Sequence, residues 1–218
     1  YFDPSNLSYV TSYATAPSGF DVNVKFTYWK SWGSSSATTI SGVSLAEGGV
    51  SGVSASTGRV SLSGAEDLDG TEGDGVFQLA PTADAPSNAK NAISLTDVLA
   101  ALKIYLGKPL PDSYASPMAT IAADFDASGA VNLSDVLLLL KYYLGKSTSA
   151  QPAWTFVDSN DLSGAGSSAV LQSGTTGVSV SKSLTTLKAI SHDFSASTSD
   201  LELIGVLRGD VDGSWTAA

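Results

Sequence analysis

The chain has 218 residues, and 43% of them are hydrophobic, which allows a sizeable core and excludes wholesale disorder. It carries 11 basic and 21 acidic residues, and the net charge of -10 argues against nucleic acid and anionic membranes as partners while favouring hard cations. The absence of cysteine excludes disulfides, cysteine-type zinc sites and thiol catalysis.

The surroundings of the protein are suggested by composition alone. An acidic, cysteine-free chain rich in Ser, Gly and Thr is common among secreted bacterial proteins, which predicts an extracellular location at the bacterial cell surface. No apolar run approaches the roughly 18 residues that a membrane-spanning helix needs, so no transmembrane segment is expected. The sequence starts at Tyr1 without a signal-peptide pattern, and we interpret it as a piece of a longer secreted protein.

Residues 1–85 are predicted to form the first part of a β-sandwich. Apolar and polar residues alternate strictly in Phe20–Tyr28, as they do in a half-buried strand. Shorter strands are expected at 39–45, 60–62 and Val76–Leu79, between Gly- and Ser-rich turns. An acidic run at 66–75 is predicted to be either a solvated turn or a further calcium site.

Residues 86–149 contain a duplicated helix. Residues 95–108 align with residues 133–146, 38 positions further on, and ten of the fourteen aligned pairs are identical. Each copy has leucines at helical spacing, a Ser/Thr-Asp start and a glycine after the last turn, which predicts two capped helices.

Residues 150–218 return to strand-like patterns and are predicted to form the second part of the β-sandwich, with an acidic loop near residue 210. The best strands are 154–157, 178–181 and Leu201–Leu207. Because neither flank of the helical segment offers many strands, we predict a mainly β fold. It would be a split, immunoglobulin-like β-sandwich interrupted by a helical insert. The alternative is three independent small domains.

The loop before the second helix has the spacing of a calcium-binding EF-hand. Calcium prefers about six to eight oxygen ligands, which a twelve-residue loop supplies from positions 1, 3, 5, 7, 9 and 12. Position 6 must turn sharply and is Gly129. The predicted calcium ligands of this main site are the side chains of Asp124, Asp126, Ser128, Asn132 and Asp135, and the backbone carbonyl of Ala130. The alternative is an aspartate-rich turn that only caps the helix.

This loop departs from the standard EF-hand in having Ser128 at position 5 and Asp135 where Glu is usual. With these residues, the leucine-rich helix and the duplicated partner, residues 86–146 resemble a type I dockerin. The resemblance implies a pair of calcium-binding loop–helix units. It also implies docking onto a cohesin-like protein, as dockerins do.

The first repeat has no complete loop of its own. Alignment of the two helices places Pro86, Asn88, Lys90 and Asn91 where the second repeat has its first ligands and its turning glycine. Proline and lysine cannot ligate calcium through their side chains, so a contiguous site is broken.

The missing half of the first loop is expected near residue 210. Asp210, Asp212 and Ser214 have the spacing of positions 1, 3 and 5 of a calcium loop, yet no helix follows them. We predict a split calcium site made by these three residues with Asp97 and with Asn91 or Ser94. The alternative is an ordinary Asp-Gly turn.

No catalytic signature is present in the sequence. The chain has one histidine, His192, and neither a Gly-x-Ser-x-Gly elbow nor a His-Glu-x-x-His helix. We therefore predict a non-enzymatic, calcium-stabilised module of a larger secreted or cell-surface bacterial protein. Its role would be adhesive, ligand-binding or structural, with a peptide or glycan as ligand. The alternatives are a docking module for a cohesin-like partner and an accessory domain of a carbohydrate-active enzyme.

Aromatic residues are the candidates for a binding surface or a strand core. Tyr28 and Trp29 are expected to adjoin on one strand and to face opposite sides. Trp154 and Phe156 are expected to share one face of another strand.

Overall fold

A four-stranded sheet forms the centre of the protein. The computed structural model describes residues 20–47, 50–65, 76–114, 117–159, 190–193 and 201–217. The strand order is β4-β1-β8-β6, in which β1 and β8 run parallel and the outer pairs are antiparallel. These strands are β1 (Phe20–Tyr28), β4 (Arg59–Ala65), β6 (Trp154–Asp158) and β8 (Leu201–Leu207).

Two antiparallel pairs add to the β-structure of the described residues. One joins β2 (Ser44–Glu47) to β3 (Val50–Val53), and the other joins β5 (Val76–Leu79) to β7 (Ile190–Asp193). In chain order the helices lie between β5 and β6, so strands from both sides of the helical segment pair with each other. The prediction of β-structure around a helical segment is confirmed. The described residues form mixed sheets together with four α-helices, so the fold is not mainly β, and an immunoglobulin-like sandwich stays a prediction.

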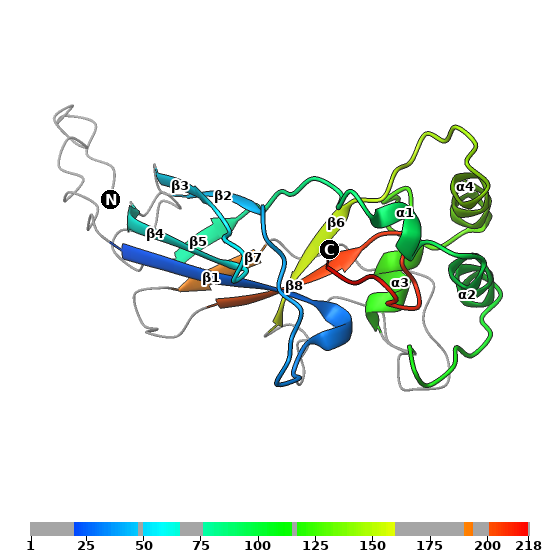
Figure 1. Cartoon of the computed structure of the whole chain (residues 1–218), viewed down its shortest axis with the longest axis horizontal. Helices are drawn as coiled ribbons and strands as arrows, with labels where there is room; N and C mark the ends of the chain where they lie inside the picture. The colour runs from blue at the N-terminus through cyan, green and yellow to red at the C-terminus, as the bar shows by residue number, and fades with distance from the viewer. Residues whose placement is uncertain are drawn as a thin grey trace, which may run out of the picture.

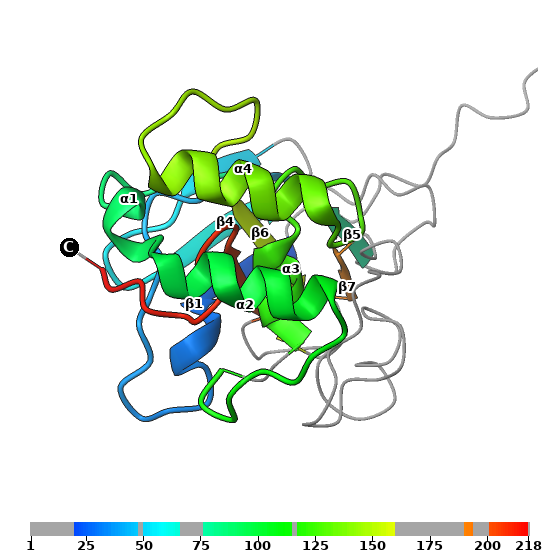
Figure 2. The ribbon, with the colours of Figure 1, turned by 90° about the vertical axis from the view of Figure 1, so that its right-hand side faces the viewer.

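The helices gather at one end of the molecule, beyond the ends of β6 and β8 (Figure 1). They are α1 (Ala89–Ala92), α2 (Leu95–Tyr105), α3 (Pro117–Ala123) and α4 (Leu133–Tyr143). The duplicated helices are α2 and α4, which lie side by side (Figure 2). Of the helices in the described residues, none is long and apolar enough to cross a membrane.

The core runs without interruption from the sheet into the helices. Along β1 the side chains of Val22, Val24, Phe26 and Tyr28 are buried, which confirms the alternation in the sequence. The same core includes the small and aliphatic residues of α3, which is buried on every side. A helix without a polar face has no amphipathic period, so α3 was not visible in the sequence pattern.

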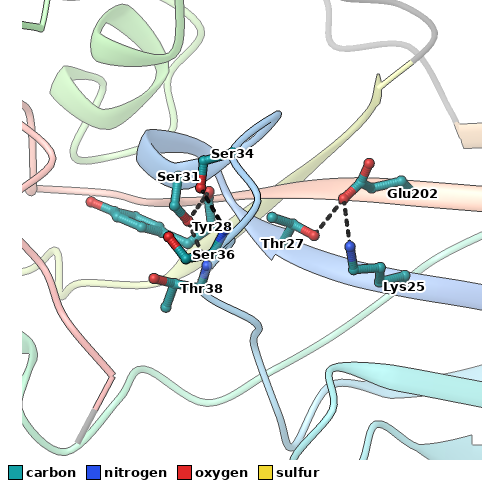
Figure 3. Close-up of polar contacts among 8 residues, drawn as sticks. All are labelled: Lys25, Thr27, Tyr28, Ser31, Ser34, Ser36, Thr38 and Glu202. Atoms are coloured by element: carbon teal, nitrogen blue, oxygen red, sulfur yellow. Dashed lines mark hydrogen bonds and ion pairs between the residues drawn. The ribbon is translucent and has the colours of Figure 1, made fainter.

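A polar side-chain contact links the parallel strands β1 and β8 (Figure 3). Glu202 of β8 accepts a hydrogen bond of 2.6 Å from the hydroxyl of Thr27 and pairs with the Lys25 ammonium at 3.3 Å. Thr27 is fully buried, so this bond also satisfies a hydroxyl that would otherwise be costly to bury.

Four sequence-based expectations need correction or fall outside the described residues. The strand expected at 39–45 begins only at Ser44, because Gly42 adopts a positive φ that breaks the extended run. Trp29 does not continue β1, since the chain turns there into a short 3-10 helix, η1 (Trp29–Ser31). The strand predicted at 178–181 and the acidic run at 66–75 lie outside the described residues.

Candidate metal-binding sites

The continuous loop before α4 brings three carboxylates together. One oxygen from each of Asp124, Asp126 and Asp135 lies within 4.8 Å of the others. Asp124 and Asp135 are buried, whereas Asp126 is exposed. Carboxylates gathered at this spacing could hold a metal ion, which agrees with the ligands predicted from the sequence.

Backbone N–H groups hold these carboxylates in place. The N–H of Ser128 donates to Oδ1 of Asp124 and to Oδ1 of Asp126, both at 3.0 Å. The N–H of Gly129 donates to the other oxygen of Asp124 at 2.9 Å. Gly129 has a φ of 87°, so the sharp turn predicted at position 6 is present. The residue two before it, Ala127, also adopts a positive φ, of 58°.

The start of α4 orients the remaining residues of the loop. Asn132 is the N-cap, and its backbone N–H donates to Oδ2 of Asp135 at 2.9 Å while its side chain accepts from the N–H of Ser134. The second oxygen of Asp135 accepts from the N–H of Asp126 at 3.2 Å. The carbonyl of Ala130 accepts a hydrogen bond of 3.3 Å from the hydroxyl of Ser128. Position 7 of the loop, Ala130, therefore lies beside position 5, Ser128.

A second cluster joins two distant parts of the chain. One oxygen from each of Asp97, Asp210 and Asp212 lies within 4.8 Å of the others. Asp97 is on the first turn of α2, and the other two follow β8. Both views of the ribbon show the segment after β8 running beside the start of α2 (Figures 1 and 2). The three carboxylates proposed for a split site are therefore neighbours in space.

The second cluster repeats the hydrogen bonds of the first. The N–H of Ser214 donates to Oδ1 of Asp210 at 2.8 Å and to Oδ1 of Asp212 at 3.0 Å, as Ser128 does in the continuous loop. The N–H of Trp215 donates to the second oxygen of Asp210 at 3.0 Å, as Gly129 does. The N–H of Asp212 donates to Oδ1 of Asp97 at 3.0 Å, as Asp126 does to Asp135.

The other half of this split loop is supplied by the residues before α2. The hydroxyl of Ser214 donates to the carbonyl of Ala92 at 3.1 Å, so Ala92 stands where Ala130 stands in the continuous loop. Ser94 is the N-cap of α2, and its N–H donates to Oδ2 of Asp97 at 2.8 Å. Asn91 is exposed on α1 and makes no polar contact with the three carboxylates within the described part of the chain.

Ala92 and Tyr28 are the residues that sequence reasoning missed. Ala92 precedes Ala130 by the same 38 positions as the two helices, and this offset could have identified it. Tyr28 ends β1 and donates its hydroxyl to Oδ2 of Asp210. No local sequence signal connects Tyr28 to a residue so far along the chain.

Gly209 allows the segment after β8 to pack closely against the helical segment. A Cβ atom on Gly209 would lie 2.5 Å from Cδ1 of Ile93 and 3.0 Å from Cε2 of Phe125, closer than packed atoms tolerate. The N–H of Gly209 also donates to the carbonyl of Ala122 at 2.7 Å. The segment is thus packed between the two helical repeats.

Burial makes both clusters unfavourable for negative charge. It raises the pKa of Asp97 to about 6, although N–H groups of Asp212 and Ser94 donate to this carboxylate. Burial likewise raises the pKa of Asp210, against the opposing effect of the Tyr28 hydroxyl. In the continuous loop, burial raises the pKa of Asp124 and Asp135. A bound cation would relieve the repulsion that three close carboxylates create.

Comparison of the chain with protein-family models, curated proteins and solved structures gave no significant match.

Proposed function

We propose that the protein is a calcium-stabilised, non-catalytic module with two calcium sites. The continuous loop of residues 124–135 holds one ion. The split loop holds the second between the segment after β8 and the start of α2. Calcium is the preferred cation because both clusters offer only oxygen ligands, from carboxylates, hydroxyls and carbonyls, and the chain has no cysteine.

One observation carries this proposal. The residues after β8 repeat, donor by donor and acceptor by acceptor, the hydrogen bonds of the continuous loop, although the Asp97 carboxylate that Asp212 bonds is 115 positions earlier in the chain. An ordinary Asp-Gly turn has no reason to reproduce the position 12 carboxylate or the position 7 carbonyl from a separate helix. The repetition therefore supports a pair of EF-hand-type, dockerin-like units.

The role that fits these sites is within a larger secreted or cell-surface bacterial protein. Extracellular calcium near millimolar concentration would saturate sites of modest affinity, and binding to the folded state alone would stabilise the fold. On this proposal, the helices are a dockerin-like insert within a β-sandwich, and the sheet carries an adhesive, ligand-binding or structural role.

Calorimetric titration of the chelated protein with calcium tests the proposal. We expect two ions to bind and the melting temperature to rise. Asp210→Ala and Asp124→Ala should each remove one ion, whereas the exposed Asp112→Ala, outside both clusters, should remove none. Two ions bound by Asp210→Ala would refute the split site, and no binding to the parent chain at millimolar calcium would refute the whole proposal.

A second candidate function is docking onto a cohesin-like partner, as the resemblance to dockerins implies. Its support is a row of exposed leucines at matching positions of the two repeats. On and just after α2 these are Leu95, Leu99 and Leu106, and on and just after α4 they are Leu133, Leu137 and Leu144, all between 47% and 58% exposed. Exposed apolar groups at this density favour an interface.

Titration of the calcium-loaded chain with purified cohesin domains tests the docking function. A complex that Leu99→Asp and Leu137→Asp together abolish would support it, with Ser61→Asp, at an exposed position of β4 outside the helices, as the control. If an excess of cohesin produced no heat of binding and no complex of higher mass, the docking function would be contradicted.

A further inference from the structure

A polar pocket of about 260 Å³ opens where the sheet meets the helical segment. It lies between the start of β6, the residues that precede α1 and the residues that follow the split cluster. The lining residues that matter for recognition are Ser41, Asp84, Ser87, Asn88, Trp154 and Trp215. The pocket is distinct from both metal clusters, because none of their carboxylates lines it.

Two indole rings line the floor of this pocket, and of these Trp154 is half-buried whereas Trp215 is only 7% exposed. The rings of Trp154 and Trp215 meet edge to face at 87°, with centroids 5.1 Å apart. Trp154 is half-buried and also stacks on Phe156, as their shared face on β6 predicts. Gly205 of β8 lies beneath: a Cβ atom there would be 2.2 Å from Cδ1 of Ile40 and 3.4 Å from Cε3 of Trp154. The floor therefore rests directly on the sheet.

Asn88 holds one wall of the pocket in place. Its side-chain carbonyl accepts a hydrogen bond of 2.9 Å from the Trp215 indole N–H. Its amide nitrogen donates to the carbonyl of Thr216 at 2.8 Å. Because both ends of the amide are used in this way, the wall is already formed without a ligand.

The rim of the pocket disfavours an anionic ligand and offers partners to hydroxyl groups. Asp84, Ser41 and Ser87 are exposed and place a carboxylate and two hydroxyls around the indole floor. Among the described residues that line the pocket there is no lysine or arginine, which disfavours phosphates and carboxylates. A sugar ring combines an apolar C–H face, which packs on an indole, with hydroxyls that donate to carboxylates and hydroxyls.

We propose that this pocket binds a neutral sugar residue of a glycan. The volume is below the range of about 300–1,000 Å³ that is typical of drug-sized ligands, which suits one sugar ring rather than a longer chain. The proposal gives a ligand class to the ligand-binding role proposed above, and rests on it. A peptide is disfavoured because the pocket offers little apolar lining beyond the indole floor.

The test titrates the calcium-loaded full chain with glucose, galactose, mannose, xylose and N-acetylglucosamine, and with short β-linked oligomers of each. Binding is followed by tryptophan fluorescence and by saturation-transfer NMR. At least one of these sugars should give saturable binding. Asp84→Asn and Ser87→Ala, both at exposed positions, should each weaken it about tenfold, as expected for the loss of one good hydrogen bond. Asp112→Asn, an exposed carboxylate outside the pocket, is the matched control.

Failure of every sugar to saturate would overturn the proposal, and so would binding that Asp84→Asn leaves unchanged. Calcium calorimetry on the same preparation separates this result from failure of the metal sites. Two bound calcium ions without sugar binding would refute the pocket alone. Sugar binding without calcium binding would support the pocket and refute the calcium function.

Discussion

The hydroxyl of Tyr28 donates a buried hydrogen bond to Oδ2 of Asp210, across 182 positions of the chain. Tyr28 is the last residue of β1, and Asp210 is one of the three carboxylates of the split cluster, Asp97, Asp210 and Asp212. The bond therefore connects the centre of the sheet with a carboxylate that we assign to calcium. The continuous loop has no equivalent tyrosine bond to Asp124 within the described residues.

Replacement of Tyr28 by phenylalanine is expected to weaken one calcium site selectively. Residues that orient metal ligands typically contribute about 10- to 100-fold to metal affinity. Tyr28→Phe should lower affinity at the split site within this range and leave the continuous site unchanged, as measured by calorimetry. Tyr142→Phe is the control, because Tyr142 packs against Phe125 near the continuous loop without contacting a carboxylate of either cluster. An equal loss at both sites would contradict the assignment.

Tryptophan fluorescence should report the split site alone. Trp215 follows the split cluster directly and packs on Tyr28 at a centroid distance of 5.0 Å, whereas residues 117–146 contain no tryptophan. We expect calcium to change the emission of the parent chain and of Asp135→Asn. In Asp97→Asn the change should be absent. A response in Asp97→Asn equal to that of the parent chain would contradict a metal site beside Trp215.

The fourth position of each loop offers a matched pair of backbone substitutions. Ala127 and Gly213 both adopt a positive φ, of 58° and 72°. A left-handed conformation costs a residue with a Cβ about 1–2 kcal/mol. Ala127→Gly should therefore raise the free energy of unfolding by about 1 kcal/mol.

The reverse substitution, Gly213→Ala, should lower stability by more than that. Its Cβ would also lie 2.8 Å from Cδ of Lys30 and from Cζ2 of Trp29. Urea unfolding with calcium present measures both variants. Destabilisation by Ala127→Gly would show that its left-handed conformation carries no such cost.

The ion-free protein should become more stable as the pH falls from about 7.5 to about 5. The pKa of Asp97 is about 6 in the folded state against an ordinary 3.8, so the folded state binds this proton more tightly than the unfolded chain does. The resulting stability is complete below pH 3.8 and is lost as the pH rises through 6. For Asp97 alone it is on the order of 3 kcal/mol.

Calcium should reverse this pH dependence, because it requires ionised carboxylates and protons compete with it. The rise in melting temperature that calcium produces should shrink as the pH is lowered through about 6. Thermal melts with chelator and with calcium, at each pH, measure the difference. A calcium effect that is constant from about pH 7.5 to about pH 5 would contradict carboxylate ligation by Asp97.

Local patterns explain what the sequence could predict. The bounds of β1, β5 and β8, and the starts of α2 and α4, follow from strict alternation, leucine spacing and capping residues. The proximity of Asp210 to Asp97 could be predicted because their two segments correspond to the two halves of one calcium loop. The complete version of that loop is present at 124–135. The internal repeat thus acted as a template for a distant contact.

Features that depend on tertiary packing could not be predicted in this way. Tyr28 reaches Asp210 only because β8 inserts between β1 and β6, an order that no local pattern specifies. Helix α3 is buried on all sides. Asn91 lies on α1 and not in the split loop, because the segment after β8 occupies the positions that a contiguous loop would have used. In each case the neighbours come from another part of the chain.

The split loop also sets an order in which the protein can fold. The two halves of the continuous loop are adjacent in sequence, so they can bind an ion as soon as α4 forms. Asp97 and Asp210, in the two halves of the split loop, are 113 positions apart. Asp210 follows β8, which pairs in parallel with β1, so we expect the halves to meet only after that pairing has formed. Closing so long a loop is slow and entropically costly. Calcium uptake should therefore occur in two kinetic phases, and the slower one should coincide with completion of the sheet.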